Sequence, residues 1–398
     1  MRPGRGKTDL LIVGAGPAGS TLAALTARAG AHVTLVERAA FPRGTVCGEF
    51  VSAEGCSVLR RLRLIDRLRA EGAPAMRGCR VTDLHGRGFE AGLPNLQSFG
   101  REALGISRER LDDALLQRAA TEGTTVRRRT EAVEPLLTDG RVTGYRLRPV
   151  GENVTEELRA SLVVAADGRR SQLARRFHPQ LCDPQRTRSG SWFGLKVHLR
   201  AEADRLAGNV ELHLFDTGYA GLGAIEGGRI NLCLLLTVET LRACGGRPER
   251  VLAERVLLNP AARERIGDAR PVGRWHSVGP LRWGVRRATA GGALFVGDAA
   301  GTVDPFCGEG ISNALRGAEL ALPHVLTALA EGRLESRVAA EYERSWREAF
   351  GPATRRVRRL GRLLERRRLA GPVLGLLGGA ARGWAPHLVA ATRSGRRA

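Results

Sequence analysis

The stretch from Asp9 to Gly19, DLLIVGAGPAG, decides the fold of this chain. Its first half is a short apolar run that predicts a buried strand, and its second half matches the pattern G-x-G-x-x-G. Gly14 allows a tight turn, Gly16 lets the backbone approach a pyrophosphate, and Gly19 lets the following helix pack against the strand. The N-terminus of that helix offers free N–H groups and a positive dipole end to phosphates. The stretch therefore predicts a dinucleotide site.

A second apolar run supports this interpretation. His32 to Val36 predicts another strand, and Glu37 ends it, about twenty residues beyond the glycines, where a ribose hydroxyl needs an acceptor. A glycine-rich turn in some other kind of α/β protein is the alternative.

Length and charge set the limits of the interpretation. The chain has 398 residues, enough for two or three domains with an ample core. Its formal net charge is +22, and all of its 63 basic residues except Lys7 and Lys196 are arginine. Residues 353–398 hold twelve Arg and one Glu, a net charge of +11. Such a basic tail suits nucleic acid, an anionic membrane or an acidic partner.

Cysteine usage and hydropathy indicate a reducing cytoplasm. The seven Cys are scattered without a CxxC motif or metal-ligand spacing, so we expect free thiols and no metal site. The apolar run before Gly14 is too short for a signal peptide and enters the glycine motif directly. No uninterrupted apolar stretch reaches about eighteen residues, so no spanning helix is expected.

Two segments after the second strand carry reactive or charged groups. Cys47 and Glu49 lie in a loop before a helical stretch, Ala53 to Ala70. Cys47 is either a thiol with a lowered pKa or a buried structural thiol. Ser107 predicts the N-cap of a later helix, and Arg108 in its first turn opposes the helix dipole. That placement favours an anionic partner, with a solvated Arg as the alternative.

The middle of the chain predicts strands. Thr125 to Val133 and Arg141 to Arg148 resemble a strand and half of a hairpin around Asp139-Gly140. Leu158 to Ala166 predicts a buried strand that ends in Asp167-Gly168, where doubly wound sheets bind ligands.

Residues 191–285 are mostly strands separated by glycine turns, which favours an antiparallel, substrate-facing sheet. His198 and His213 lack a third ligand at a suitable spacing, so they do not predict a metal site.

A second glycine-rich turn follows. Gly292 to Val296 predicts a buried strand that runs into Gly297-Asp298, and a helix begins at about Ile311. Asp298 is placed for a hydroxyl chain, and the N–H groups of residues 310–312 can hold an oxyanion or an electron-rich ring edge.

Three separated motifs carry a family resemblance: GAGPAG…ER at 14–38, AADG at 165–168 and VGDAAGTVDPFCGEGISNA at 296–314. Their order and separation resemble the flavoprotein superfamily of p-hydroxybenzoate hydroxylase and geranylgeranyl reductase, over about residues 8–330. The resemblance implies an α/β fold: a Rossmann-type FAD-binding domain with an inserted, mainly antiparallel β-sheet substrate domain and a C-terminal helical tail. It implies FAD as cofactor and NAD(P)H as the reductant.

The same resemblance assigns the cofactor-binding residues. These residues serve the adenosine diphosphate half, the pyrophosphate, the ribityl chain and the ring of FAD. They are Gly14, Gly16, Gly19, Glu37, Arg38, Arg108, Asp167, Gly168, Gly297, Asp298, Gly310 and Ile311.

The expected domains are discontinuous. Residues 1–80, 106–180 and 286–330 form the FAD-binding domain, 81–105 and 181–285 the substrate domain, and 331–398 the helical basic tail. A second nucleotide-binding βαβ unit with its own glycine fingerprint is absent from the sequence, so NAD(P)H is expected to bind transiently near Asp167-Gly168.

The reaction type is less well indicated. Phe41 to Glu49 resembles a segment of geranylgeranyl reductases, but residues 218–226 lack the Trp of the corresponding motif in those reductases and in flavin halogenases. Lys196 lies in the wrong segment for the halogenase lysine. We therefore expect a monooxygenase that hydroxylates a hydrophobic aromatic or polyketide-type substrate.

The alternative reaction is reduction of a C=C bond in a polyprenyl or lipid substrate, with Cys47 or Glu49 assisting proton delivery. A third interpretation is a non-catalytic, membrane-associated binding protein. Cys47 and Cys307, both placed near the flavin by the resemblance, form a hypothetical redox pair.

The tail admits two interpretations. Val357, Leu360, Leu363 and Leu364 share one helical face among many Arg residues, which is typical of an interfacial helix on anionic lipid. The alternative is a C-terminal helical cap packed on the flavin domain. Nucleic-acid binding is not expected.

Overall fold

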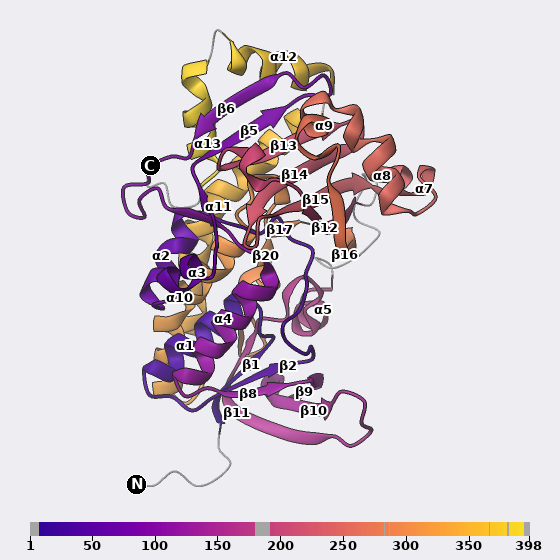
Figure 1. Ribbon diagram of the computed structural model, residues 1–398. Coiled ribbons are helices and arrows are strands. Elements are labelled where there is room, and N and C mark those ends of the chain that lie inside the picture. Colours follow the sequence, from indigo (N-terminus) through magenta and orange to yellow (C-terminus); the bar gives the residue numbers. More distant parts are fainter. Residues whose placement is uncertain are drawn as a thin grey trace.

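The computed structural model describes residues 8–179, 192–281, 283–285, 287–365, 367–379 and 382–393. Two large sheets dominate this part of the chain, one at each end of an elongated molecule (Figure 1). The glycine turns lie at the edge of one sheet, and the other sheet faces them.

The first sheet is parallel at its centre. Its order is β18-β19-β11-β1-β2-β8, with β10 and β9 branching from β11, and β19, β11, β1, β2 and β8 run parallel. The strands are β1 (Thr8–Val13), β2 (Val33–Glu37), β8 (Thr125–Arg128), β9 (Thr130–Thr138), β10 (Arg141–Pro149), β11 (Glu156–Ala165), β18 (Thr289–Ala290) and β19 (Ala293–Phe295).

The apolar runs explain the central strands. Leu10, Leu11 and Ile12 of β1 are fully buried, as expected for a parallel strand that is covered on both faces. The helix α1 (Pro17–Arg28) follows at once with Pro17 in its first turn, where the missing N–H is harmless. The predicted α/β fold is confirmed.

The hairpin at Asp139-Gly140 is also confirmed, since β9 and β10 pair antiparallel around it. Both turn residues have positive φ, 50° and 75°, as a tight two-residue hairpin turn requires.

Two predicted elements are wrong in their extent. The strand expected over 125–133 is broken at Arg129, where φ is 52°. As a result, β8 pairs with β2 and β9 pairs with β10. The helix expected over 53–70 is broken in the same way at Arg63 (φ 56°). It forms α2 (Ala53–Arg61) and α3 (Ile65–Ala70).

The second sheet has the order β16-β12-β15-β14-β13-β5-β6. Among the described strand pairs of this sheet, β13 and β5 run parallel, and the other pairs run antiparallel. The strands are β5 (Gly78–Thr82), β6 (Gly88–Gly92), β12 (Trp192–Arg200), β13 (Asn209–Phe215), β14 (Gly218–Ile225), β15 (Arg229–Thr237) and β16 (Arg270–Leu281).

Side chains along these strands point alternately to the two faces of the second sheet. Leu195, Val197 and Leu199 of β12 are buried in an apolar core, so Lys196 and His198 point to the opposite face. That face is the one that meets the first half of the chain.

Helices and two small sheets, one of three strands (β3-β7-β4) and one of two (β17-β20), complete the described fold. The helices not yet named are α4 (Arg108–Thr121), α5 (Gln172–Phe177), α7 (Val238–Ala243), α8 (Pro248–Glu254), α9 (Pro260–Ile266), α10 (Gly310–Ala330), α11 (Ser336–Glu365), α12 (Arg367–Gly378) and α13 (Ala385–Ala391). The short strands are β3 (Phe50–Val51), β4 (Ala75–Met76), β7 (Ala103–Gly105), β17 (Gly284–Val285) and β20 (Gly301–Thr302).

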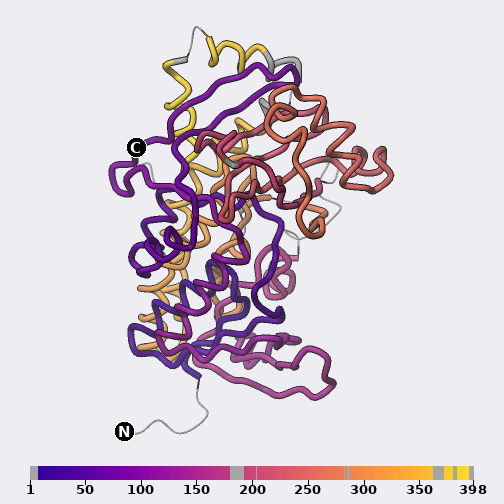
Figure 2. Tube along the Cα trace, in the orientation of Figure 1, coloured from indigo at the N-terminus to yellow at the C-terminus, as the bar shows by residue number. Residues whose placement is uncertain are grey.

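The tail packs on both halves of the molecule: Val338, Tyr342 and Trp346 of α11 are buried in the core of the first sheet, whereas α12 and α13 pack on the second sheet. The yellow C-terminal trace lies beside β6 (Figure 2), and Leu374, Ala385 and Val389 are buried in the core of that sheet. Arg393 is buried and forms an ion pair with Glu309, just before α10. In the described part of the chain, no helix is long and apolar enough to cross a membrane. Contact of the tail with an anionic membrane stays a prediction.

A glycine pair in α12 tests this packing. A Cβ on Gly378 would overlap the carbonyl oxygen of Gly88 in β6, whereas a Cβ on Gly375 meets no atom within 4 Å. Gly378→Ala should push the tail off the sheet and lower the free energy of unfolding by about 1–3 kcal/mol. The matched change Gly375→Ala should not.

Limited trypsin digestion and urea denaturation measure the effect, since the released tail is rich in Arg. Equal cleavage and equal stability of the two variants would contradict the packing of α12 on β6.

Candidate active site

Three turns predicted from the sequence meet at one edge of the first sheet. β1, β11 and β19 are adjacent and parallel, so the turns that follow them share the carboxyl edge of the sheet. These turns begin at Gly14, Asp167 and Gly297. In such sheets, ligands bind outside the carboxyl ends of the strands.

The first glycine turn is shaped to hold phosphates. A Cβ on Gly14 (φ 104°) would lie 2.5 Å from the carbonyl oxygen of Ala166, and a Cβ on Gly19 would overlap the carbonyl oxygen of Gly14. Gly16 caps α1 without any side-chain hydrogen bond, which leaves the first N–H groups of the helix for a ligand. These residues fit the pyrophosphate of a dinucleotide.

Glu37 braces this turn from the end of β2. Its carboxylate accepts hydrogen bonds from the N–H of Ala15 (2.9 Å) and from the N–H of Ala39 (2.8 Å). Arg43, which the sequence interpretation omitted, lies 3.7 Å from this carboxylate. Arg38 is exposed at the surface.

The second and third turns lie side by side. Asp167 accepts a hydrogen bond from the N–H of Gln172 (2.9 Å), and burial raises its pKa. The next residue, Gly168 (φ 72°), lets the chain turn into η1 (Gly168–Arg170). Arg169 of η1 lies 3.8 Å from Asp298 of η5 (Gly297–Ala299).

A narrow cavity lies between the third turn and α10. Its lining includes Gly297, Asp298 and Gly310, all predicted as cofactor-binding residues, together with Asn313. Ile311 is buried in the core, so only its backbone is available to a ligand.

Both cysteines of the hypothetical redox pair are free thiols. Cys307 is buried and donates a hydrogen bond to the carbonyl oxygen of Asp304 (3.1 Å), and burial raises its pKa to about 12. It is therefore a protonated thiol at neutral pH, and so is a poor nucleophile. Cys47 is half-buried and accepts a hydrogen bond from the N–H of Glu49 (3.4 Å).

The carboxylate of Glu49 is the centre of a buried charged cluster. It accepts hydrogen bonds from Lys196 Nζ, from His198 Nε2 (2.7 Å) and from the N–H of Arg108 (2.7 Å). Burial alone would raise its pKa, but the hydrogen bonds and positive charges of His198 and Lys196 hold the pKa below the ordinary value. Glu49 is thus a fixed negative charge, which suits it to positioning Lys196 and His198 better than to donating a proton.

The backbone at Glu49 is also constrained, with φ at 55°. A non-glycine residue in this region is strained and persists where its surroundings over-determine it. Asn231 of β15 adds to this restraint, because its amide donates to the carbonyl oxygen of Cys47 (3.0 Å).

Arg108, predicted to approach the cofactor, forms two hydrogen bonds to Asp112 one turn along α4 (2.7 and 2.8 Å). Ser107 accepts a hydrogen bond from the N–H of Arg110 (3.3 Å), which confirms the predicted N-cap of this helix.

Sequence reasoning missed Lys196 and His198 as partners of Glu49. The available signal was two ionisable residues at alternate positions in the apolar run WFGLKVHL at 192–199, which a strand places together on one face. That signal locates the pair but does not identify the carboxylate. In the described residues, no cluster of three or more His, Cys, Asp or Glu can hold a metal ion.

The cluster predicts a large mutational effect. Glu49→Gln leaves Lys196 buried without a counter-charge, so the free energy of unfolding should fall by about 3–5 kcal/mol at neutral pH. Glu49→Gln combined with Lys196→Met should recover part of this loss. The control Glu131→Gln breaks a half-exposed pair with Arg148 (2.7 Å) and should have little effect.

Urea denaturation measures all four proteins at neutral and acidic pH. Because the pKa of Glu49 is lowered in the folded state, its stabilisation is present at neutral pH and disappears as the pH falls through that value. Equal stability of Glu49→Gln and Glu131→Gln at neutral pH would contradict the role of this cluster.

Curated relatives are similar along most of the chain. The chain is 28% identical over 363 residues to the digeranylgeranylglycerophospholipid reductase of Methanosarcina mazei, covering 87% of this chain and 82% of that protein. It is 29% identical over 348 residues to digeranylgeranylglycerophospholipid reductase 2 of Methanopyrus kandleri, covering 86% and 83%.

Solved structures share the fold. The myxobacterial chondrochloren halogenase has a TM-score of 0.74 at 26% identity, covering 88% of this chain and 81% of that one. A geranylgeranyl bacteriochlorophyll reductase-like protein from Thermoplasma acidophilum has 0.76 at 20%, covering 94% and 92%. PqsL, a probable FAD-dependent monooxygenase from Pseudomonas aeruginosa, has 0.70 at 21%, covering 92% and 99%.

The sequence model of the FAD binding domain matches residues 7–356. That match spans all three glycine turns and the Glu49 cluster. The chain belongs to the FAD-binding domain family, and the predicted relationship to the flavoprotein oxidoreductases is confirmed.

Proposed function

We propose that this FAD-dependent oxidoreductase is a monooxygenase, which uses NAD(P)H to hydroxylate an aromatic or polyketide-type substrate. The observation that carries the proposal is the character of the second sheet where it faces Glu49. The two rows of β12, β15 and β14 nearest Glu49 bear polar and small residues, while Leu212 of β13 and Leu235 of β15 lie farther along the same face.

Strand register defines this face. Lys196 pairs with Cys233, and Cys233 pairs with Gly221, so all three lie on one face of the sheet. His198, Asn231 and Gly223 form the next row. A Cβ on Gly223 would lie 3.9 Å from the carbonyl oxygen of Gly48, so this row lies beside the segment that holds Cys47 and Glu49.

Aliphatic side chains dominate the opposite face at β12, β14 and β15, and Glu211 and His213 of β13 share that face. Leu232, Leu234, Ala220 and Leu222 are buried in the core of the second sheet. A long isoprenoid chain needs an apolar lining, and the rows of β12, β15 and β14 nearest Glu49 contain no aliphatic side chain. A flat ring with oxygen substituents suits glycines, an amide and a lysine better.

An aromatic pair borders the same region. Tyr219, on the face of Gly221, meets Phe306 edge to face with ring centroids 5.7 Å apart. Phe306 belongs to η6 (Pro305–Cys307), just before α10. Aromatic rings prefer such geometry toward one another, so a third ring is a suitable guest here.

The chain's own groups would bind and orient the substrate. Lys196 Nζ has three N–H donors, and Glu49 is its only hydrogen-bond acceptor among the described residues. The remaining donors can bind a ring oxygen and stabilise negative charge on it. FAD, when bound at the glycine turns, would supply the redox chemistry.

Reduction of a C=C bond in a polyprenyl or lipid substrate is the second candidate. Its support is the similarity to digeranylgeranylglycerophospholipid reductases and the Cys47-Gly48-Glu49 segment. The lowered pKa of Glu49 weighs against that residue as the proton donor of such a reaction.

Isotopic oxygen separates the two reactions. The FAD-loaded protein, given NADPH or NADH, catalase and ¹⁸O₂, should place one ¹⁸O atom in a phenolic or polyketide-type product. The control reaction without oxygen should give no product. A saturated product formed from a polyprenyl substrate without oxygen would contradict the proposal.

A further inference from the structure

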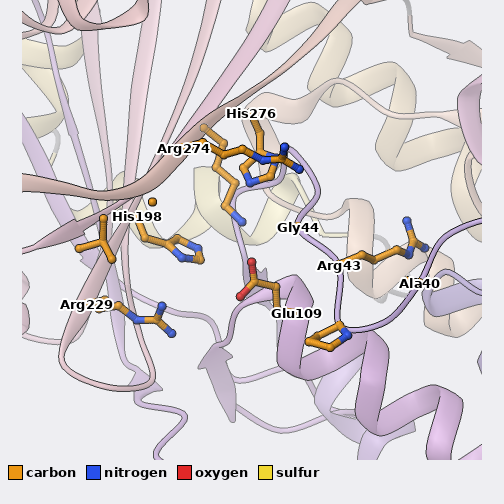
Figure 3. Close-up of a pocket in the computed structure, with 12 residues that line it drawn as sticks. Ala40, Arg43, Gly44, Glu109, His198, Arg229, Arg274 and His276 are labelled. Atoms are coloured by element: carbon orange, nitrogen blue, oxygen red, sulfur yellow. The ribbon is translucent and has the colours of Figure 1, made fainter.

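A second cavity, of about 530 Å³, lies between β12, β15, β16 and the segment 40–44 (Figure 3). It shares no lining residue with the cavity at Gly297 and Asp298. Lys196 and His198 contribute to its wall, so a substrate ring bound to Lys196 would lie in or beside this cavity. The other lining residues come mainly from the segment 40–44, β15 and β16.

These other residues are strongly basic. Arg43, Arg229, Arg274 and His276 line the cavity, and Glu109 is the only carboxylate among the lining residues. Figure 3 shows Arg274 and His276 together on one side, Arg229 below His198, and Arg43 across the cavity from them. The groups come from three separate parts of the chain, so tertiary folding concentrates positive charge here.

A β-bulge places Arg274. Lys196 of β12 pairs with His276, and His198 pairs with Val272. The interval of two residues from Lys196 to His198 in β12 therefore lies opposite an interval of four residues in β16. The extra residues of β16 include Gly273 (φ 76°) and Arg274. Bulges with a glycine at positive φ redirect neighbouring side chains and are frequent beside binding sites.

The three arginines differ in their counter-ions. Arg43 lies 3.3 Å from Asp112, and Arg229 lies 3.1 Å from Glu226. Within the described residues, no carboxylate lies within 4.0 Å of Arg274, which is exposed at the cavity wall. Among the described residues, Arg274 is thus the arginine of this cavity that has no carboxylate within ion-pair distance.

We propose that this cavity binds the phosphate group of an organic phosphate. Guanidinium groups bind phosphate oxygens through paired hydrogen bonds, and the volume is in the range of small-molecule sites, larger than a bare phosphate requires. The ligand is either a pyridine nucleotide that acts as reductant or a phosphorylated substrate. The site is independent of whether the reaction is hydroxylation or reduction.

His276 supports this assignment. Burial and the positive charges of Lys196 and Arg274 lower its pKa, with Glu109 opposing them and His198 adding to them. The imidazole is therefore neutral at neutral pH. A bound phosphate would offset the positive charges, raise this pKa and cause proton uptake on binding.

Calorimetric titration of the FAD-loaded protein tests the proposal with three probes: adenosine 2′,5′-bisphosphate, dihexanoyl phosphatidic acid and inorganic pyrophosphate. Arg274→Gln should weaken binding of one organic phosphate about tenfold, or about 1.4 kcal/mol. The control Arg270→Gln changes an exposed arginine of the same strand outside the cavity and should leave binding unchanged. In buffers of different ionisation enthalpy, wild-type binding should show proton uptake that His276→Gln removes.

Each outcome of the titration either supports the phosphate site or contradicts it. Weakened binding of the bisphosphate assigns the site to the reductant, and weakened binding of phosphatidic acid assigns it to a substrate. Binding of pyrophosphate alone, or equal binding by the wild type and both arginine variants, overturns the proposal. Because the ¹⁸O₂ experiment reads the reaction and this titration reads a ligand, the two proposals fail separately.

Discussion

The buried carboxylate of Glu49 joins the two halves of this molecule. It lies in the segment after β2, and it binds Lys196 and His198 of β12 together with the backbone N–H of Arg108. A buried charge of this kind is stable only while its partners stay in place. The Glu49 cluster is therefore one of the contacts that fix the second sheet over the glycine turns, together with the Asn231–Cys47 hydrogen bond and the Arg393–Glu309 ion pair.

The glycine turns and the Glu49 cluster have separate roles. The turns at Gly14, Gly168 and Gly297 create space at the carboxyl edge of a parallel sheet, where a dinucleotide can bind. The cluster fixes the face of the second sheet that lies beside the segment of Cys47 and Glu49. Solved structures with this fold include a halogenase, a reductase-like protein and a probable monooxygenase. The scaffold is shared, and the chemistry is set by residues placed on it.

Local patterns predicted the parts of the molecule that local physics determines. The glycine turns and their strands follow from short motifs, since turn geometry and burial act over a few residues. Lys196 was not connected with Glu49 because 147 residues separate them, and strand alternation gives a face but no partner. The breaks at Arg63 and Arg129 were missed because neither glycine nor proline marks them. The periodicity of the tail could not distinguish a protein surface from a lipid surface.

The most direct test of the account is the FAD affinity of Gly16→Ala. A Cβ at Gly16 meets no protein atom closer than 3.8 Å, so the variant should fold normally and obstruct only a bound pyrophosphate. Titration of the apoprotein, followed by flavin absorbance, should give one FAD per wild-type chain and at least tenfold weaker binding by Gly16→Ala. A wild-type protein that stays colourless after FAD addition, or a variant that binds FAD equally well, would contradict the account.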